Sequence, residues 1–248
     1  MNIYTIALAI KILLAISIAA DLAAVLKRSL MMLQLNSYRN ERFTRWFNQS
    51  GESTTPWRLA VCIALFLTLV NHLPGVFTQA AAAIIVICNF VSLIRRRYKK
   101  PLVFTPRAKR LYAVMLGLAL IIPAIAGLIT GNLATACKIG LAEIVLSPLF
   151  TLTANILLRP VEKSINRRYY NEAASILRSM PDLKVIGITG SYGKTSTKHY
   201  LHHILSQEFE TLMTPGSYNT TMGVIRTIRE MMRPYTQIFI AEMGAKQP

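Results

Sequence analysis

The chain has 248 residues, of which 53% are hydrophobic, and it carries a formal net charge of +17. A single soluble domain seldom combines so many apolar residues with such an excess of basic ones, so we expect two parts of different character. The long apolar runs all lie in residues 1–158, and residues 159–248 contain none.

Five apolar stretches in the first part are long enough to cross a bilayer as helices. A crossing helix needs roughly 17–25 mostly apolar residues. We therefore predict an α-helical transmembrane bundle of about five spans over residues 1–158. Buried core helices of a soluble protein are the alternative, which five such runs in succession disfavour. The stretches are Ile3–Leu26, Trp57–Leu73, Val76–Ile94, Leu111–Thr130 and Leu133–Leu158.

The Lys and Arg residues of this part lie in alternate loops. Six fall within residues 27–58 and eight within residues 95–110, whereas the turns near Pro74 and Gly131 have none. Because basic loops tend to stay in the cytoplasm, we predict a multi-pass protein of the cytoplasmic membrane, with its N-terminus outside and residues 159–248 in the cytoplasm. Attraction to membrane lipid explains the same basic residues, so we expect no nucleic-acid partner.

Residues 159–183 are predicted to form a connecting amphipathic helix, which would either dock on the following domain or lie along the membrane surface. Residues 184–248 then alternate between strands and helices, which indicates an α/β domain with a parallel sheet. The expected strands are Val185–Ile188, about Glu210–Met213, and Gln237–Ala241, and the expected helices are Thr195–Ser206 and Met222–Met232.

A glycine-rich run, Gly187 to Ser196, joins the first of these strands to the first helix. Its backbone N–H groups, the helix N-terminus and Lys194 would cradle phosphate, and the Thr195 hydroxyl lies where a magnesium ion would bind. The general P-loop pattern needs glycine where this chain has Ile188, so only the shorter form Thr-Gly-x-x-Gly-Lys-Thr is present. An ordinary strand-to-helix turn is the alternative. We predict an ATP-binding P-loop with Lys194 as its catalytic lysine, formed by Thr189, Gly190, Ser191, Tyr192, Gly193, Lys194, Thr195 and Ser196.

Glu242 directly follows the apolar residues of the third strand. Mg²⁺ prefers hard oxygen ligands, often one or two from protein and the rest from phosphate and water. We therefore predict Thr195 and Glu242 as the protein ligands of a magnesium ion. A strand that ends in a charged residue on reaching solvent is the ordinary alternative.

Three segments together resemble the Mur ligases, and within that family most of all the D-alanyl-D-alanine-adding type. They are the loop Thr189–Lys198, the turn Thr214–Gly223 and the strand end Ile240–Gly244, so the resemblance covers about residues 184–248. It implies an ATP- and Mg²⁺-dependent ligase that forms an amide bond through an acyl phosphate in peptidoglycan precursor synthesis. It also makes Asn219 and Thr220 candidates for contact with substrate.

The chain departs from the family in two ways. Membrane spans occupy the place of the family's substrate-binding domain, which leaves open whether the peptidoglycan precursor is soluble or lipid-linked. The sequence stops six residues after Glu242, so residues 184–248 would be only the N-terminal part of the central ATP-binding domain, and we expect this chain alone to be inactive. The alternative function is a non-catalytic membrane protein whose P-loop remnant senses nucleotide or docks a partner.

Overall fold

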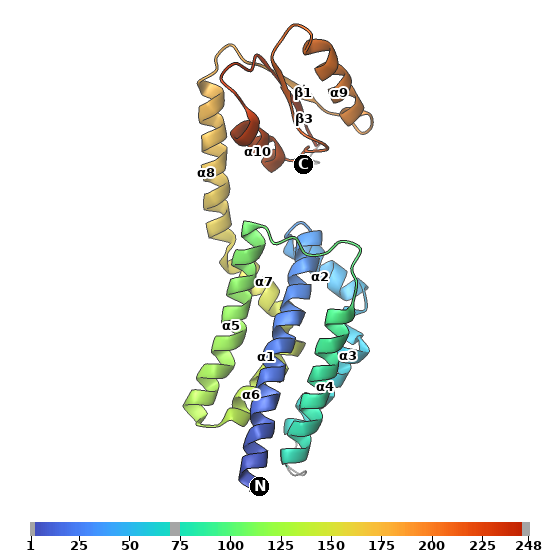
Figure 1. Ribbon diagram of the computed structural model, residues 1–248, viewed down its shortest axis with the longest axis vertical. Coiled ribbons are helices and arrows are strands. Elements are labelled where there is room, and N and C mark those ends of the chain that lie inside the picture. The colour runs from blue at the N-terminus through green and yellow to red at the C-terminus, as the bar shows by residue number, and fades with distance from the viewer. Residues whose placement is uncertain (1–2, 70–74, 245–248) are drawn as a thin grey trace. The chain divides into compact units, whose positions relative to one another are not determined.

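The computed structural model describes residues 3–69 and 75–244. The chain divides into two compact units, Met1–Arg159 and Pro160–Pro248. The first is helical, and the second combines a small sheet with three helices (Figure 1).

The first unit is built around its N-terminal helix. Leu14, Ile18, Leu22, Leu26 and Leu30 recur every four residues along this helix, so they share one face, and all are buried against the other helices. The elements are α1 (Ile3–Leu35), α2 (Asn40–Gln49), the 3₁₀ turn η1 (Glu52–Thr54), α3 (Pro56–Leu69), α4 (Gly75–Arg95), α5 (Pro106–Thr130), α6 (Leu133–Val145) and α7 (Ser147–Leu157).

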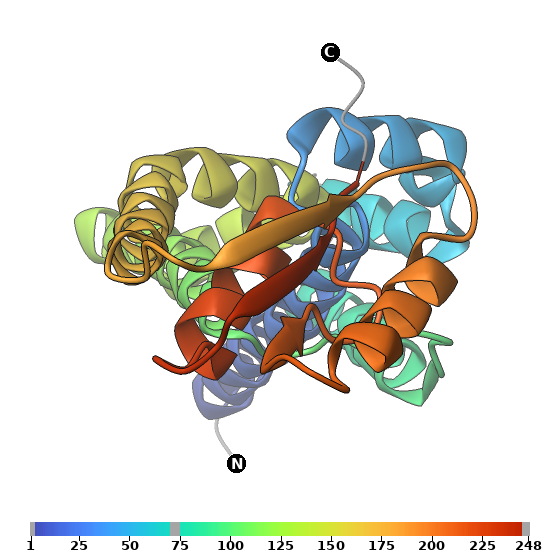
Figure 2. The ribbon, with the colours of Figure 1, turned by 90° about the horizontal axis from the view of Figure 1, so that it is seen from above.

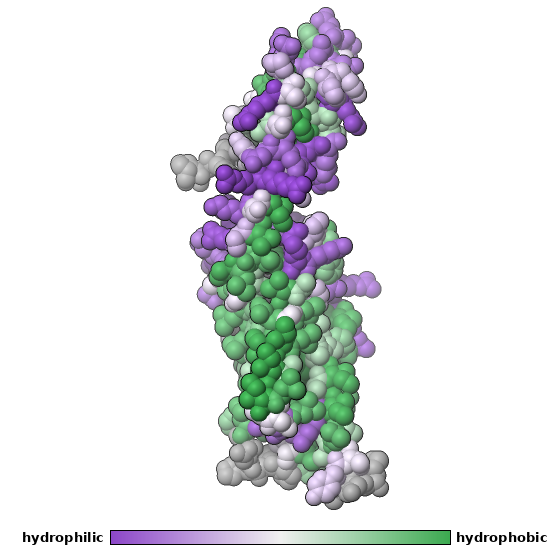
Figure 3. Space-filling model, turned by 90° about the vertical axis from the view of Figure 1, so that its left-hand side faces the viewer, coloured by the Kyte–Doolittle hydropathy of each residue, from purple (hydrophilic) through white to green (hydrophobic). Residues whose placement is uncertain are grey.

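Three of the described helices, α1, α4 and α5, are long and apolar enough to cross a membrane. Helices α6 and α7 would add a fourth span if the bent pair crosses the membrane as a single span. Large apolar side chains such as Phe66, Phe77 and Leu128 are exposed on the unit, and apolar residues cover much of the side seen in Figure 3. A soluble protein rarely exposes so much contiguous apolar surface, whereas lipid would cover it.

Two of the five expected spans differ from the prediction. The stretch Trp57–Leu73 forms α3 over only 14 residues, about 21 Å at 1.5 Å per residue, which is short of a hydrocarbon core of about 30 Å. Its last residues, from 70 onward, lie outside the described part. The stretch Leu133–Leu158 is two helices that meet at 79° around Leu146. Pro148 follows this break, in the first turn of α7, where its missing N–H group costs no hydrogen bond.

The basic segments gather at one end of the first unit. Gln34, near the end of α1, exchanges two hydrogen bonds with the backbone of Val103, at 2.8 and 3.0 Å. Asn155 of α7 donates to the Tyr38 carbonyl at 3.0 Å and to Asn40 Oδ1 at 2.6 Å. The ends of α1 and α7 and the segment between α4 and α5 therefore lie together, as alternating basic loops require.

The second unit has a three-stranded parallel sheet of order β1-β3-β2 (Figure 2). All residues of the central strand β3 are buried. Helix α8 docks on this unit, since Ala173 packs with Ile225 and Ile228 of α10 and with Phe239 of β3. The elements are α8 (Arg159–Arg178), β1 (Lys184–Ile188), α9 (Lys194–Leu205), β2 (Thr211–Met213), α10 (Thr221–Met231) and β3 (Ile238–Glu242), all close to the expected bounds.

Candidate nucleotide site

The glycine-rich loop joins β1 to α9 through a left-handed turn. Gly193 is the residue before α9 and has φ +72°, a conformation that side chains with a Cβ resist. Among the described residues, no side chain caps α9, so the N–H groups of its first turn have no side-chain acceptor there. Such donors, together with the helix dipole, favour a bound anion.

Lys194 folds back over the same loop. Its Nζ donates a hydrogen bond of 2.6 Å to the carbonyl oxygen of Gly190. The ammonium group therefore lies beside the free N–H groups and adds a full positive charge to theirs. Ser191 and Ser196 are exposed, as is Thr189, and Tyr192 is 96% exposed.

The two predicted metal ligands are brought together. The parallel register sets Ile188 opposite Glu242, so the end of β3 lies beside the start of the loop. Thr195 Oγ1 donates to Glu242 Oε2 at 3.0 Å, although the two residues are 47 positions apart in the chain. Glu242 is 2% exposed, which excludes the interpretation that it merely marks where a strand reaches solvent.

Lys198 is a member of this cluster that the sequence prediction missed as a site residue. It is fully buried, and its Nζ donates to Glu242 Oε2 at 3.0 Å and also to the carbonyl of Gly216. A signal was available, because Lys198 lies three residues after Thr195 and therefore on the same face of the predicted helix.

The turn between β2 and α10 is tied to the end of β3. Thr214 accepts a hydrogen bond from the Glu242 N–H at 3.1 Å, and the Asn219 carbonyl accepts one from Gly244 at 2.7 Å. The Thr220 side chain caps α10 by accepting from the Gly223 N–H at 3.1 Å. Asn219 thus lies beside the cluster through its backbone, and the Thr220 hydroxyl is engaged in the cap.

The charge of Glu242 is stabilised by its neighbours. Burial raises the pKa of this carboxyl, but hydrogen bonds from Lys198 and Thr195 and the charges of Lys198 and Lys194 outweigh burial and hold the pKa below its usual value. Glu242 is therefore a carboxylate at neutral pH.

The cluster suits a magnesium ion that is shared with phosphate. No group of three or more His, Cys, Asp or Glu residues lies together in the described part of the chain, so a metal site made of protein ligands alone is not found there. Thr195 and Glu242 supply two hard oxygen donors, as Mg²⁺ prefers when phosphate and water complete its shell. Both side-chain hydrogen bonds to Glu242 end on Oε2, which leaves Oε1 without such a partner among residues 3–69 and 75–244.

Comparison with known families agrees with this geometry. Residues 188–248 match the Mur ligase middle domain. Over these residues, which we call the Mur ligase segment, the chain is similar to the Mur ligase family. The chain is 39% identical over 61 residues to the UDP-N-acetylmuramoyl-tripeptide--D-alanyl-D-alanine ligase of Bacillus subtilis and 38% identical over 79 residues to that of Escherichia coli.

The matches cover a small part of each protein. They span 25% and 32% of this chain and only 13% and 17% of the two relatives. A third ligase of the same name, from Synechocystis, is 35% identical over 77 residues, which are 31% of this chain and 17% of the relative. No solved structure matches the chain.

Proposed function

We propose that the chain is the membrane-anchored, nucleotide-binding part of an ATP-dependent ligase that forms an amide bond in peptidoglycan precursor synthesis. The observation that carries this proposal is the cluster of Thr195, Lys198 and Glu242 beside the glycine-rich loop. The relatives that share this segment are named as UDP-N-acetylmuramoyl-tripeptide--D-alanyl-D-alanine ligases. The residue cluster and the similarity to these ligases are independent observations, and together they support nucleotide binding.

The reaction assigns a role to each residue. ATP transfers its terminal phosphate to a carboxylate, which gives an acyl phosphate and ADP, and an amine then displaces phosphate to form the amide. Lys194 and the N–H groups of the loop bind the phosphates, which are the charged groups to be positioned and neutralised. Thr195 and Glu242 would hold a magnesium ion, which would neutralise phosphate charge, and Lys198 fixes the Glu242 carboxylate.

The helical unit supports an enzyme that works at the cytoplasmic face of the membrane. Its long apolar helices precede the Mur ligase segment, and its basic segments lie at one end. ATP is present on the cytoplasmic side, where the positive-inside rule places basic segments. A precursor carried on a lipid would meet the enzyme there, and a soluble precursor would reach it from the cytoplasm.

Nucleotide binding by the whole chain in lipid nanodiscs tests the proposal. We expect a fluorescent ATP analogue to bind in the presence of Mg²⁺ and Lys194→Ala to weaken binding by about tenfold or more, since a charge-assisted contact is lost. Lys184→Ala is the matched control, because Lys184 is an exposed lysine at the opposite end of β1. If Lys194→Ala and Lys184→Ala bind the ATP analogue equally well, the glycine-rich loop is not the nucleotide site.

Turnover separates a ligase from a nucleotide sensor. Because we expect this chain alone to be inactive, the assay uses membranes that contain the complete ligase of which we propose this chain to be a part. Those membranes should release phosphate from ATP only when both a precursor carboxylate and an amine are supplied. Binding of ATP without such release, across soluble and lipid-linked precursors, would favour the sensor.

A further inference from the structure

A small pocket lies at the basic end of the first unit. It is bordered by α1, α2, η1, the start of α3, the end of α4 and the break between α6 and α7. Arg28, Arg58 and Arg96 line it together with one acidic residue, Glu52, so the lining carries an excess of two positive charges. The nucleotide site is in the other unit, so this pocket requires a separate explanation.

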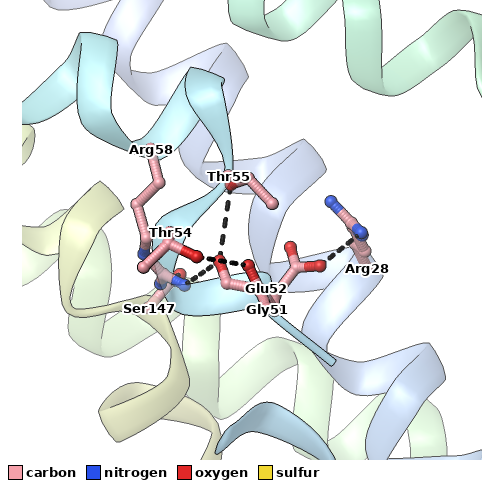
Figure 4. A network of polar contacts seen from close by, with 7 residues as sticks. All are labelled: Arg28, Gly51, Glu52, Thr54, Thr55, Arg58 and Ser147. Carbon is pink, nitrogen blue, oxygen red and sulfur yellow. Dashed lines mark hydrogen bonds and ion pairs between the residues drawn. The ribbon is translucent and has the colours of Figure 1, made fainter. Parts of the chain in front are cut away.

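Arg58 has a structural role at the helix break. Its guanidinium donates to Ser147 Oγ and to the Glu52 carbonyl, both at 3.3 Å (Figure 4). The same guanidinium donates to the Val145 carbonyl at 2.8 Å. It also lies over the Phe47 ring, 4.9 Å from the centroid. Arg58 therefore satisfies carbonyl groups that the bend frees and fixes one wall of the pocket.

Arg28 and Arg96 keep unused hydrogen-bond donors. Arg28 Nη2 forms an ion pair with Glu52 Oε2 at 2.7 Å, but the Arg28 Nε is buried and has no hydrogen-bond partner among residues 3–69 and 75–244. Arg96 is exposed, and no hydrogen bond or ion pair of Arg96 is found within the described residues. A buried donor without an acceptor is uncommon in native proteins and costs free energy, so an anion in the pocket would satisfy it.

The volume of the pocket and its position in the helical unit indicate which class of ligand it can bind. The cavity has a volume of about 50 Å³, which is room for a few waters or for one phosphate group. Trp46 and Trp57 also line the pocket, and tryptophan is enriched where a membrane meets water. We propose that this pocket binds the terminal phosphate group of a membrane lipid, whose apolar chains lie along the exposed apolar surface of the helical unit.

Lipid binding to the full chain, measured by native mass spectrometry, tests this assignment. Phosphatidic acid has a terminal phosphate, phosphatidylserine has a comparable net charge without one, and phosphatidylcholine is neutral. We expect the protein to retain phosphatidic acid in preference to both. Arg96→Gln should weaken this retention by about tenfold, as for the loss of one charge-assisted hydrogen bond.

Two further variants separate the pocket from its surroundings. Arg28→Gln combined with Glu52→Gln removes the pocket donor without leaving an unpaired carboxylate, and we expect the same loss of about tenfold. Arg97→Gln is the matched control, because Arg97 is an exposed neighbour of Arg96 outside the lining, and it should retain phosphatidic acid. Binding of the ATP analogue should be unchanged in all three variants.

Three results would overturn the assignment. Equal retention of phosphatidylserine and phosphatidic acid would mean that the protein senses surface charge alone. An equal loss in Arg97→Gln would assign the effect to the basic segment as a whole. In a third case, inorganic phosphate would displace phosphatidic acid and would also bind to protein that is surrounded by phosphatidylcholine alone. The ligand would then be the free phosphate ion rather than a lipid.

Discussion

At the scale of single residues, the ion pair between Lys198 and Glu242 decides the stability of the candidate nucleotide site. Both side chains are almost completely buried, at 0% and 2% exposure. Lys198→Met would leave a buried carboxylate without its cation, and we expect the second unit to lose about 3–5 kcal/mol. Hydrogen exchange of β3 should show this loss, and adding Glu242→Gln should recover part of it. Unchanged exchange in Lys198→Met would show that the pair contributes little.

The same carboxylate should make the second unit sensitive to acid. Because the pKa of Glu242 is lower in the folded chain than its ordinary 4.5, folding gains stability that is fully present above pH 4.5 and is lost as the pH falls through the folded pKa. Calorimetry in nanodiscs should therefore show a lower melting temperature for this unit at acid pH. In Glu242→Gln, the melting temperature of this unit should change less with pH. If it changes with pH as steeply as in the unchanged chain, other carboxyl groups cause the acid sensitivity.

At the scale of elements, local sequence patterns predicted most bounds but not the packing between elements. Strand β1 was expected from Val185 and begins at Lys184, and α10 was expected from Met222 and begins at Thr221. The order β1-β3-β2 depends on contacts between distant residues and could not be read from local patterns. Spacing placed Lys198 on the same helix face as Thr195, but it did not show that Lys198 is buried against Glu242. The break at Leu146 was missed because Leu133–Leu158 is mostly apolar on both sides of it, although Pro148 was a local signal.

The docking of α8 gives a test at this scale, since the sequence left its partner open. Ala173 is 3% exposed in the cluster with Ile225 and Phe239, so Ala173→Glu would place a charge in an apolar contact. We expect the C-terminal half of α8 to lose protection from hydrogen exchange. Ser175→Glu, at an exposed position of the same helix, should retain protection. Equal protection in the two variants would show that α8 does not depend on this contact.

At the scale of the whole molecule, the helical unit explains how one chain can be both strongly basic and strongly apolar. Apolar side chains cover the outside of long helices, and the basic segments are confined to one end by contacts such as Gln34 with Val103. Asn155 holds the end of α7 at that same end, through Tyr38 and Asn40. The bent pair α6–α7 therefore returns the chain to the basic end, although neither helix alone is long enough to span.

Because α6 and α7 bring the chain back to the basic end of the helical unit, we can predict which exposed positions lie on each side of the membrane. In a chain with Cys62, Cys88 and Cys137 replaced by alanine, single cysteines at Arg97, Thr130 and Ser191 occupy exposed positions. A membrane-impermeant maleimide should label Thr130→Cys on intact cells, and Arg97→Cys and Ser191→Cys only after permeabilisation. Reversed labelling of all three would refute a cytoplasmic nucleotide site. Labelling of Ser191→Cys together with Thr130→Cys would show instead that α6 and α7 re-enter without crossing. The three positions thus separate an error in orientation from an error in the number of crossings.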